Sequence, residues 1–157
     1  MMNFRIPALA AALALAASGA ALAQSTPMPM NMPMASPAPP NLTPTGPALT
    51  IKLLPQNGSG ESGTATFTPV AGGTLVSIKI TAGVADVPQP NHVHPGTCAT
   101  LDPKPQYGLP PIKDGTSSAV IPASIADLLA TPHAFNVHKS GPEAAIYVAC
   151  GDIVKPK

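Results

Sequence analysis

Two histidines in the stretch 91–98 have a spacing that suits metal binding. His92 and His94 are separated by one residue, and Cys98 follows shortly after. Successive side chains of an extended strand point to opposite faces, so both imidazoles would project to one side while Val93 faces the core. Neutral imidazole is a common ligand of copper and zinc. The pair therefore predicts two arms of a metal site, and two solvated surface histidines are the alternative.

A run of methionines in the N-terminal part supplies a different kind of ligand. Every second residue from 28 to 34 is a methionine, in the order Met28, Met30, Met32 and Met34. A thioether usually fills a gap in a hydrophobic core, but the surrounding Pro-rich sequence offers no core to fill. Because clustered thioethers select Cu(I), we interpret these four as candidate additional copper ligands. A low-complexity linker that drifted in composition is the alternative.

Residues 1–23 have the pattern of a secretory signal peptide. Arg5 supplies a positive charge, an Ala/Leu-rich run spans 8–17, and Ala21-Leu22-Ala23 forms a small-x-small cleavage site. The apolar run is too short and too rich in alanine to predict a membrane span. We therefore expect an exported protein, periplasmic or secreted, with no membrane insertion after the signal is removed.

The segment 24–48 has the composition of a disordered Met/Pro-rich tail. It is dominated by Pro, Ala, Ser, Thr and Met, which cannot build a core and which favour extended polyproline geometry. The sequence after it predicts a single folded domain over 49–157.

Charge and cysteine content limit the partners and the compartment. Loss of Arg5 would leave seven basic against seven acidic residues, so no basic patch is predicted for nucleic acid and no polybasic anchor for a membrane. The two cysteines, Cys98 and Cys150, predict one disulfide in an oxidising compartment.

Alternating apolar residues predict an all-β domain. Strands are predicted over 49–54, 63–68, 74–81, 117–121, 135–138 and 145–153, with another carrying His92 and His94, a long loop over 95–115 and one helical turn over 123–129. Because period-two alternation buries one face and exposes the other, the strands are expected to pair antiparallel in a sandwich or barrel.

The run from Leu49 to Ile153 resembles the copper-zinc superoxide dismutase family. Three anchors carry the resemblance, in the family's order: the His-x-His strand followed by Cys98, the strand Phe135-Asn136-Val137-His138, and the ending Tyr147-Val148-Ala149-Cys150-Gly151-Asp152-Ile153. The resemblance implies a Greek-key β-barrel with the intrachain disulfide Cys98–Cys150. It also implies that His92, His94 and His138 bind one copper ion.

The chain departs from the family at the zinc site and at the arginine that attracts the substrate. The family's bridging and zinc-binding histidines follow its first cysteine, yet residues 99–132 contain no histidine, so no zinc is expected. The family also places an arginine that guides superoxide three residues before its second cysteine, and that position is Tyr147 here. Losing this positive charge weakens the steering of an anionic substrate.

His133 has no counterpart in the family pattern. It lies five residues before His138, so it cannot share that residue's strand face, and Pro132 predicts an approaching loop. A solvated loop histidine is expected, and a fourth copper ligand is the alternative. Three acidic residues are expected at the surface or in turns rather than at the metal: Asp102, Asp114 and Glu143.

Together these patterns predict an exported copper-binding protein that acquires or delivers copper. A copper-donor or copper-acceptor protein is then its expected partner. Enzymatic activity stays open, because a copper-only superoxide dismutase is the first alternative. A metal-free structural or interaction domain is the second.

Overall fold

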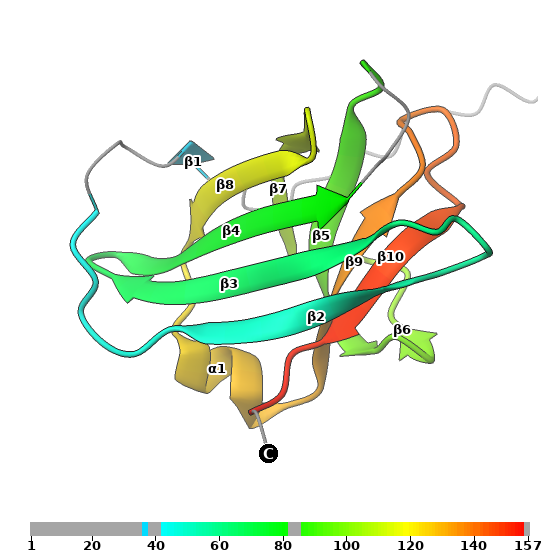
Figure 1. Ribbon diagram of the computed structural model, residues 1–157. Coiled ribbons are helices and arrows are strands. Elements are labelled where there is room, and N and C mark those ends of the chain that lie inside the picture. The colour runs from blue at the N-terminus through cyan, green and yellow to red at the C-terminus, as the bar shows by residue number, and fades with distance from the viewer. Residues whose placement is uncertain (1–35, 38–41, 82–85, 156–157) are drawn as a thin grey trace, which may run out of the picture. The chain divides into compact units, whose positions relative to one another are not determined.

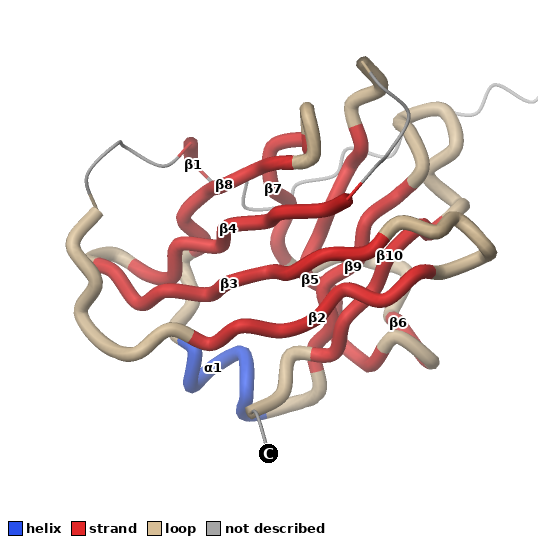
Figure 2. The backbone as a smooth tube through the Cα atoms, viewed as in Figure 1, coloured by secondary structure: helices blue, strands red, loops and turns tan. Residues whose placement is uncertain are grey.

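The predicted all-β character is confirmed in a computed structural model, which describes residues 36–37, 42–81 and 86–155. Strands dominate these residues, and one short helix accompanies them (Figure 2). The predicted signal peptide and the methionines at 28–34 lie outside the described residues. Among the described residues, no helix has the length and apolar character needed to cross a membrane.

The elements follow one another in a simple order. They are β1 (Ser36–Pro37), β2 (Leu49–Pro55), β3 (Ser62–Val70), β4 (Gly73–Thr81), β5 (Gln89–Thr97), β6 (Thr100–Leu101), β7 (Tyr107–Ile112), β8 (Thr116–Ile121), α1 (Ile125–Ala130), β9 (His133–His138) and β10 (Tyr147–Asp152). The predicted strands and the helical turn are therefore present, with shifts of one or two residues at most of their ends.

All the described strands belong to one antiparallel sheet. Its order is β1-β8-β4-β3-β2-β10-β9-β5-β6, and β7 pairs with β5 beside this path. In Figure 1, β10 runs between β2 and β9, and the sheet curls so that β7 and β5 lie behind β4 and β8. The sheet thus forms a half-barrel whose concave side holds the core.

The core follows from alternation along the strands. On β4 the residues at even positions, from Thr74 to Ile80, are buried, while their neighbours are partly or fully exposed. Phe67 of β3 and Phe135 of β9 are completely buried within the same cluster. β9 differs because every one of its residues is buried, so both of its faces are covered. One face of β9 packs on the core, and its other face carries the candidate site described below.

The region 95–115 is not the continuous loop that was predicted. It contains the end of β5 together with β6 and β7. Pro110 and Pro111 hid β7 from sequence analysis, since proline lacks the N–H that a central strand must donate. β7 is tolerated because its ladder joins it to β5 alone, and the carbonyl of Pro110 accepts hydrogen bonds from Asn91 Nδ2 at 2.8 Å and Ser117 Oγ at 2.7 Å. The sheet does not close between β7 and β8, because β8 pairs with β4 on one edge and with β1 on the other.

Some residues of the predicted tail pair with the sheet. Ser36 and Pro37 pair with Val120 and Ala119 at the edge of β8. Pro44 forms an isolated bridge with Val70. Contacts with the sheet therefore begin before the domain boundary predicted at residue 49.

The predicted disulfide is present and ties the segment after β5 to β10. Cys98 and Cys150 are bonded, with their Cα atoms 5.8 Å apart. The backbone N–H of Cys98 also donates to Asp152 Oδ1 at 2.7 Å. Two independent links thus hold the chain just beyond His94 against the last strand.

Candidate metal centre

Three histidines meet on one face of the ladder between β5 and β9. In this antiparallel ladder His92 lies opposite Asn136, and His94 lies opposite Ala134. His138 is two residues beyond Asn136 on β9, so all three imidazoles stand on the same side. Val93 is buried in the core, as predicted from the alternation, and it lies opposite Phe135, which is buried there too. The expected convergence of His92, His94 and His138 is therefore confirmed.

The distances suit a single metal ion. One ring nitrogen from each histidine lies within 4.8 Å of the corresponding nitrogens of the other two. His92 Nδ1 and His138 Nε2 are 2.9 Å apart. Three nitrogens bound to one ion at about 2.0 Å are separated by little more than 3 Å, so small ring movements would complete the coordination.

Backbone carbonyl groups fix the tautomers of two of these rings. His94 Nδ1 donates to the carbonyl oxygen of Asp102 at 2.7 Å, and His138 Nδ1 donates to that of Ala144. A neutral imidazole that carries its proton on Nδ1 keeps a lone pair on Nε2. Both Nε2 atoms are therefore prepared as metal ligands, in the way that outer hydrogen bonds commonly orient ligating histidines.

Burial keeps the three rings uncharged. For His92, burial is the largest cause, followed by repulsion from His138 and His94, and its pKa falls to about 4. Burial also lowers the pKa values of His94 and His138, against the opposing effect of the hydrogen bonds to Asp102 and Ala144. Neutral imidazole is the form that binds metals, so none of the three rings has to give up a charging proton before a metal binds at pH 7.

The site also contains a buried nitrogen that a metal would satisfy. His94 is 1% exposed, and its Nε2 has no hydrogen-bond partner among the described residues. A buried acceptor left unpaired costs about 1–3 kcal/mol. Nε2 is the ring nitrogen of His94 that the hydrogen bond to Asp102 leaves free, and the three histidines each have a ring nitrogen within 4.8 Å of the other two, so the residues fit a metal ion held by three nitrogen ligands.

The expectation that His133 is a solvated loop residue is wrong. His133 begins β9 and is 6% exposed. Its Nδ1 faces the carbonyl oxygens of Leu128 and Thr131, and its Nε2 lies 2.7 Å from Gln106 Oε1. Pro132 suggested a loop, but the strand starts at the very next residue. The parity argument holds, because His133 stands on the face opposite to His138 and outside the three-histidine group.

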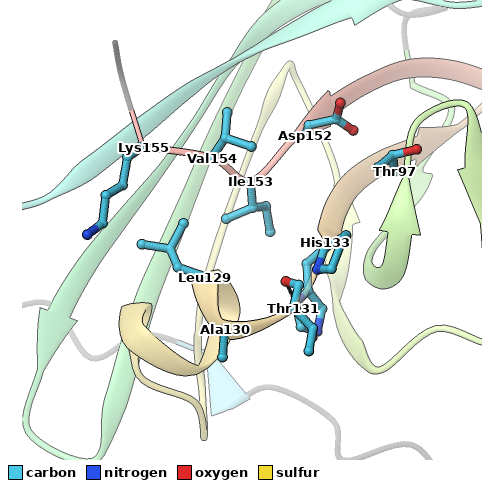
Figure 3. Close-up of a pocket in the computed structure, with 10 residues that line it drawn as sticks. Thr97, Leu129, Ala130, Thr131, His133, Asp152, Ile153, Val154 and Lys155 are labelled. Atoms are coloured by element: carbon cyan, nitrogen blue, oxygen red, sulfur yellow. Dashed lines mark hydrogen bonds between the residues drawn. The ribbon is translucent and has the colours of Figure 1, made fainter.

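His133 instead borders a cavity of about 400 Å³ at the end of the half-barrel. Figure 3 shows this cavity between α1 and the end of β10, with His133 and Thr131 on one side and Val154 and Lys155 on the other. The hydrogen bonds of the His133 side chain join α1 to the residue that precedes β7, which is a structural role. It is therefore not brought to the metal centre.

Tyr147 lies beside the metal centre. Its ring centroid is 5.0 Å from that of His138, in an edge-on arrangement. Tyr147 is partly exposed, so its neutral ring, rather than a cation, covers this side of His138.

Sequence reasoning missed two backbone groups that orient the histidines and one side chain that lies beside them. The carbonyl groups of Asp102 and Ala144 act through the backbone, which residue type does not reveal. Asp102, Asp114 and Glu143 keep their side chains exposed, as expected. Asn136 was noted only as part of a strand motif, although its position two residues before His138 places it on the same face. Parity along β9 was thus a usable signal for Asn136.

No protein-family model matches the chain, and neither does any curated protein or solved structure.

Proposed function

We propose that this protein is an exported copper-binding protein of superoxide-dismutase-like fold. It binds one copper ion through His92, His94 and His138, and its Met-rich segment acquires or delivers copper. The observation that carries the proposal is the convergence of three neutral imidazoles, two of them held in the tautomer that offers Nε2. The antiparallel half-barrel and the Cys98–Cys150 disulfide support the proposed relationship of the fold.

The ligand set supports copper as the metal. The group consists of imidazoles alone, without a carboxylate or a thiolate among the described residues. Copper(II) binds nitrogen ligands more strongly than the other divalent first-row metals, and imidazole also suits Cu(I). A structural zinc site usually has four protein ligands, whereas three are assembled here. Copper held in this way supplies one-electron chemistry.

The residues around the centre perform distinct tasks. Asp102 and Ala144 hold the rings of His94 and His138 with Nε2 directed inward. In the arrangement seen, His138 Nε2 has the lone pair, so His92 Nδ1 is the donor of their 2.9 Å hydrogen bond. For His92 to offer Nδ1 as a ligand, its proton must move to Nε2 or leave. His92 is the most exposed of the three, so water can carry that proton away.

Copper stoichiometry of the purified full chain tests the proposal. We expect one copper and no equimolar zinc, with His138→Ala lowering Cu(II) affinity by more than about 100-fold, since even outer-shell changes typically cost 10–100-fold. His133→Gln is the matched control, because it removes the remaining imidazole and leaves the three-histidine group intact. Equimolar zinc, or equal losses in both variants, would contradict the proposal. Superoxide dismutation measured on the same sample decides whether the bound copper is also catalytic.

Tyrosine fluorescence provides a second, local readout. The chain has no tryptophan and two tyrosines, Tyr107 and Tyr147. Because the Tyr147 ring contacts the edge of His138, Cu(II) bound there should quench its emission strongly. Tyr147→Phe should remove most of the quenching while retaining the copper. Tyr107 lies opposite Val93 in the β5–β7 ladder and keeps some sensitivity to the ion, so the result that would place the copper elsewhere is binding that leaves the emission of the parent protein unchanged.

A further inference from the structure

A buried amide lies at the centre of the face that carries the three histidines. Asn136 has no exposed surface, and in the sheet it lies between His92 of β5 and Cys150 of β10. Side chains directly opposite each other in an antiparallel ladder have Cβ atoms roughly 5 Å apart. The amide is therefore enclosed by an imidazole ring on one side and by the disulfide on the other.

The hydrogen-bonding capacity of this amide is unused. Four buried side-chain atoms lack a partner among the described residues, and three of them lie together here: His94 Nε2, Asn136 Nδ2 and Asn136 Oδ1. Unpaired buried groups are destabilising, and each requires an explanation. A cation held by the imidazoles would give Oδ1 a partner.

We propose that Asn136 is a further residue of the metal centre, whose amide oxygen faces the bound copper and makes the site favour Cu(II) over Cu(I). This inference rests on the proposed copper function. An amide oxygen is a neutral, hard donor, and its electrostatic attraction to a doubly charged ion is about twice that to a singly charged one. Cu(I) prefers soft ligands and gains less from oxygen. Asn136 thus determines which oxidation state the three imidazoles hold more tightly.

Asn136→Leu tests the inference, because it replaces the two amide atoms by methyl groups. In the full chain we expect Cu(II) affinity to fall about tenfold, and Cu(I) affinity, measured by competition with a chromogenic Cu(I) chelator, to change less than twofold. A tenfold loss confined to Cu(II) raises the reduction potential of the bound copper by about 59 mV. Asn91→Leu is the matched control, since Asn91 is equally buried but stands on the opposite face of the same ladder, where it donates to Pro110.

Thermal unfolding of the metal-free protein separates a metal-site role from a structural one. Removing an amide whose hydrogen bonds are unmade should raise Tm in Asn136→Leu, whereas Asn91→Leu should lower it. Asn136→Ala repeats the copper measurements without added side-chain volume. Equal losses of Cu(II) and Cu(I) affinity, or an unchanged potential in both Asn136 variants, would overturn the inference. A parent protein that binds neither ion would instead overturn the proposed function itself, and this inference with it.

Discussion

At the scale of single residues, His92 differs from the other two ligands. No backbone carbonyl among the described residues fixes its ring, and its Nδ1 faces another ligand, His138, rather than an outer partner. Its pKa is lowered to about 4, by burial first and by the neighbouring rings second. His92 is therefore the ligand whose protonation should couple most strongly to folding of the metal-free protein.

The stability of the metal-free protein should decrease as the pH falls from 7 to 5. In the unfolded chain, imidazoles take up protons below about pH 6.5, whereas in the folded chain His92 stays neutral down to about pH 4. The unfolded state then binds more protons, so the free energy of unfolding falls with pH. Linkage limits the contribution of His92 to this loss between pH 7 and pH 5 to about 2 kcal/mol, and solvent screening should reduce it to about 1 kcal/mol.

Urea unfolding followed by circular dichroism, on chelator-treated protein, measures this dependence. Above pH 5 the carboxylates change little, so the slope reports the histidines. His92→Gln should flatten it in part, and His94 and His138 should account for the remainder. A free energy of unfolding that stays constant between pH 7 and pH 5 would rule out the neutral three-imidazole arrangement.

At the scale of elements, the hairpin of β5 and β6 links the ligands to the disulfide. Its tight part runs from Gly96 to Asp102, whose carbonyl holds His94 and whose N–H donates to Pro95 at 2.9 Å. Gly96 has a φ of +98°, a backbone angle that residues with a side chain rarely adopt. A Cβ at this position would lie 2.2 Å from the carbonyl oxygen of Thr100. Only glycine allows this hairpin to close so tightly behind the His-x-His pair.

Gly96→Ala should therefore damage both stability and metal binding. The backbone strain costs on the order of 1–3 kcal/mol, and displacement of the Asp102 carbonyl should weaken Cu(II) binding by about 10-fold or more. Urea unfolding and copper competition measure the two effects. Gly58→Ala is the matched control, because Gly58 also has a positive φ of 68° but a Cβ added there would have nothing within 4 Å. Comparable loss of copper affinity in both variants would refute the role of the hairpin.

The disulfide should stabilise the fold more than it tunes the site. Closing a loop between residues 52 positions apart stabilises a chain by about 4 kcal/mol in the chain-entropy account. Replacing Cys98 and Cys150 together by alanine should lower the free energy of unfolding by about that amount. Copper affinity should fall much less, since the β5–β9 ladder that places the histidines does not depend on the bond. An unchanged midpoint of urea unfolding would contradict this expectation.

The sequence predicted those elements whose local pattern agrees with their final environment. Alternation revealed β4, because one of its faces is buried and the other is more exposed. β7 was not predicted, because its two prolines are unfavourable in a central strand. They are tolerated because β7 pairs with a single neighbour, β5, which the sequence does not reveal. His133 was misjudged for a related reason, since the burial of both faces of β9 is a tertiary property. The three histidines could be predicted from the alternation of side chains along a strand. The carbonyl groups that orient two of them belong to Asp102 and Ala144, which reach the site only through the tertiary fold.

At the scale of the whole molecule, burial determines the route by which a metal ion would reach the three-histidine group. His94 and His138 are 1% and 6% exposed, so entry must occur past His92. The pairing of Ser36 and Pro37 with β8 fixes the chain two residues after Met34. Eight residues separate Met28 from Ser36 in the sequence, and a chain of that length at polyproline spacing is about 25 Å long. If the four methionines bind Cu(I), as the proposed function requires, their covalent link to the domain would raise the local concentration of Cu(I) without a second rigid site.

Replacing Met28, Met30, Met32 and Met34 together by leucine separates copper handling from copper storage. Thioethers bind Cu(I) without deprotonation, whereas three imidazoles also suit Cu(II), so the two groups should differ in the oxidation state they prefer. We expect the quadruple variant to bind Cu(I) more weakly and to load more slowly, with Cu(II) affinity at the histidines nearly unchanged. Stopped-flow transfer from a Cu(I) chelator, followed by Cu(II) competition, measures both. Asn31→Leu, which adds an apolar residue but keeps every thioether, should behave like the parent protein. If the quadruple variant exchanges Cu(I) at the parental rate, the Met-rich segment is a spacer, and the histidine centre alone must account for any copper function.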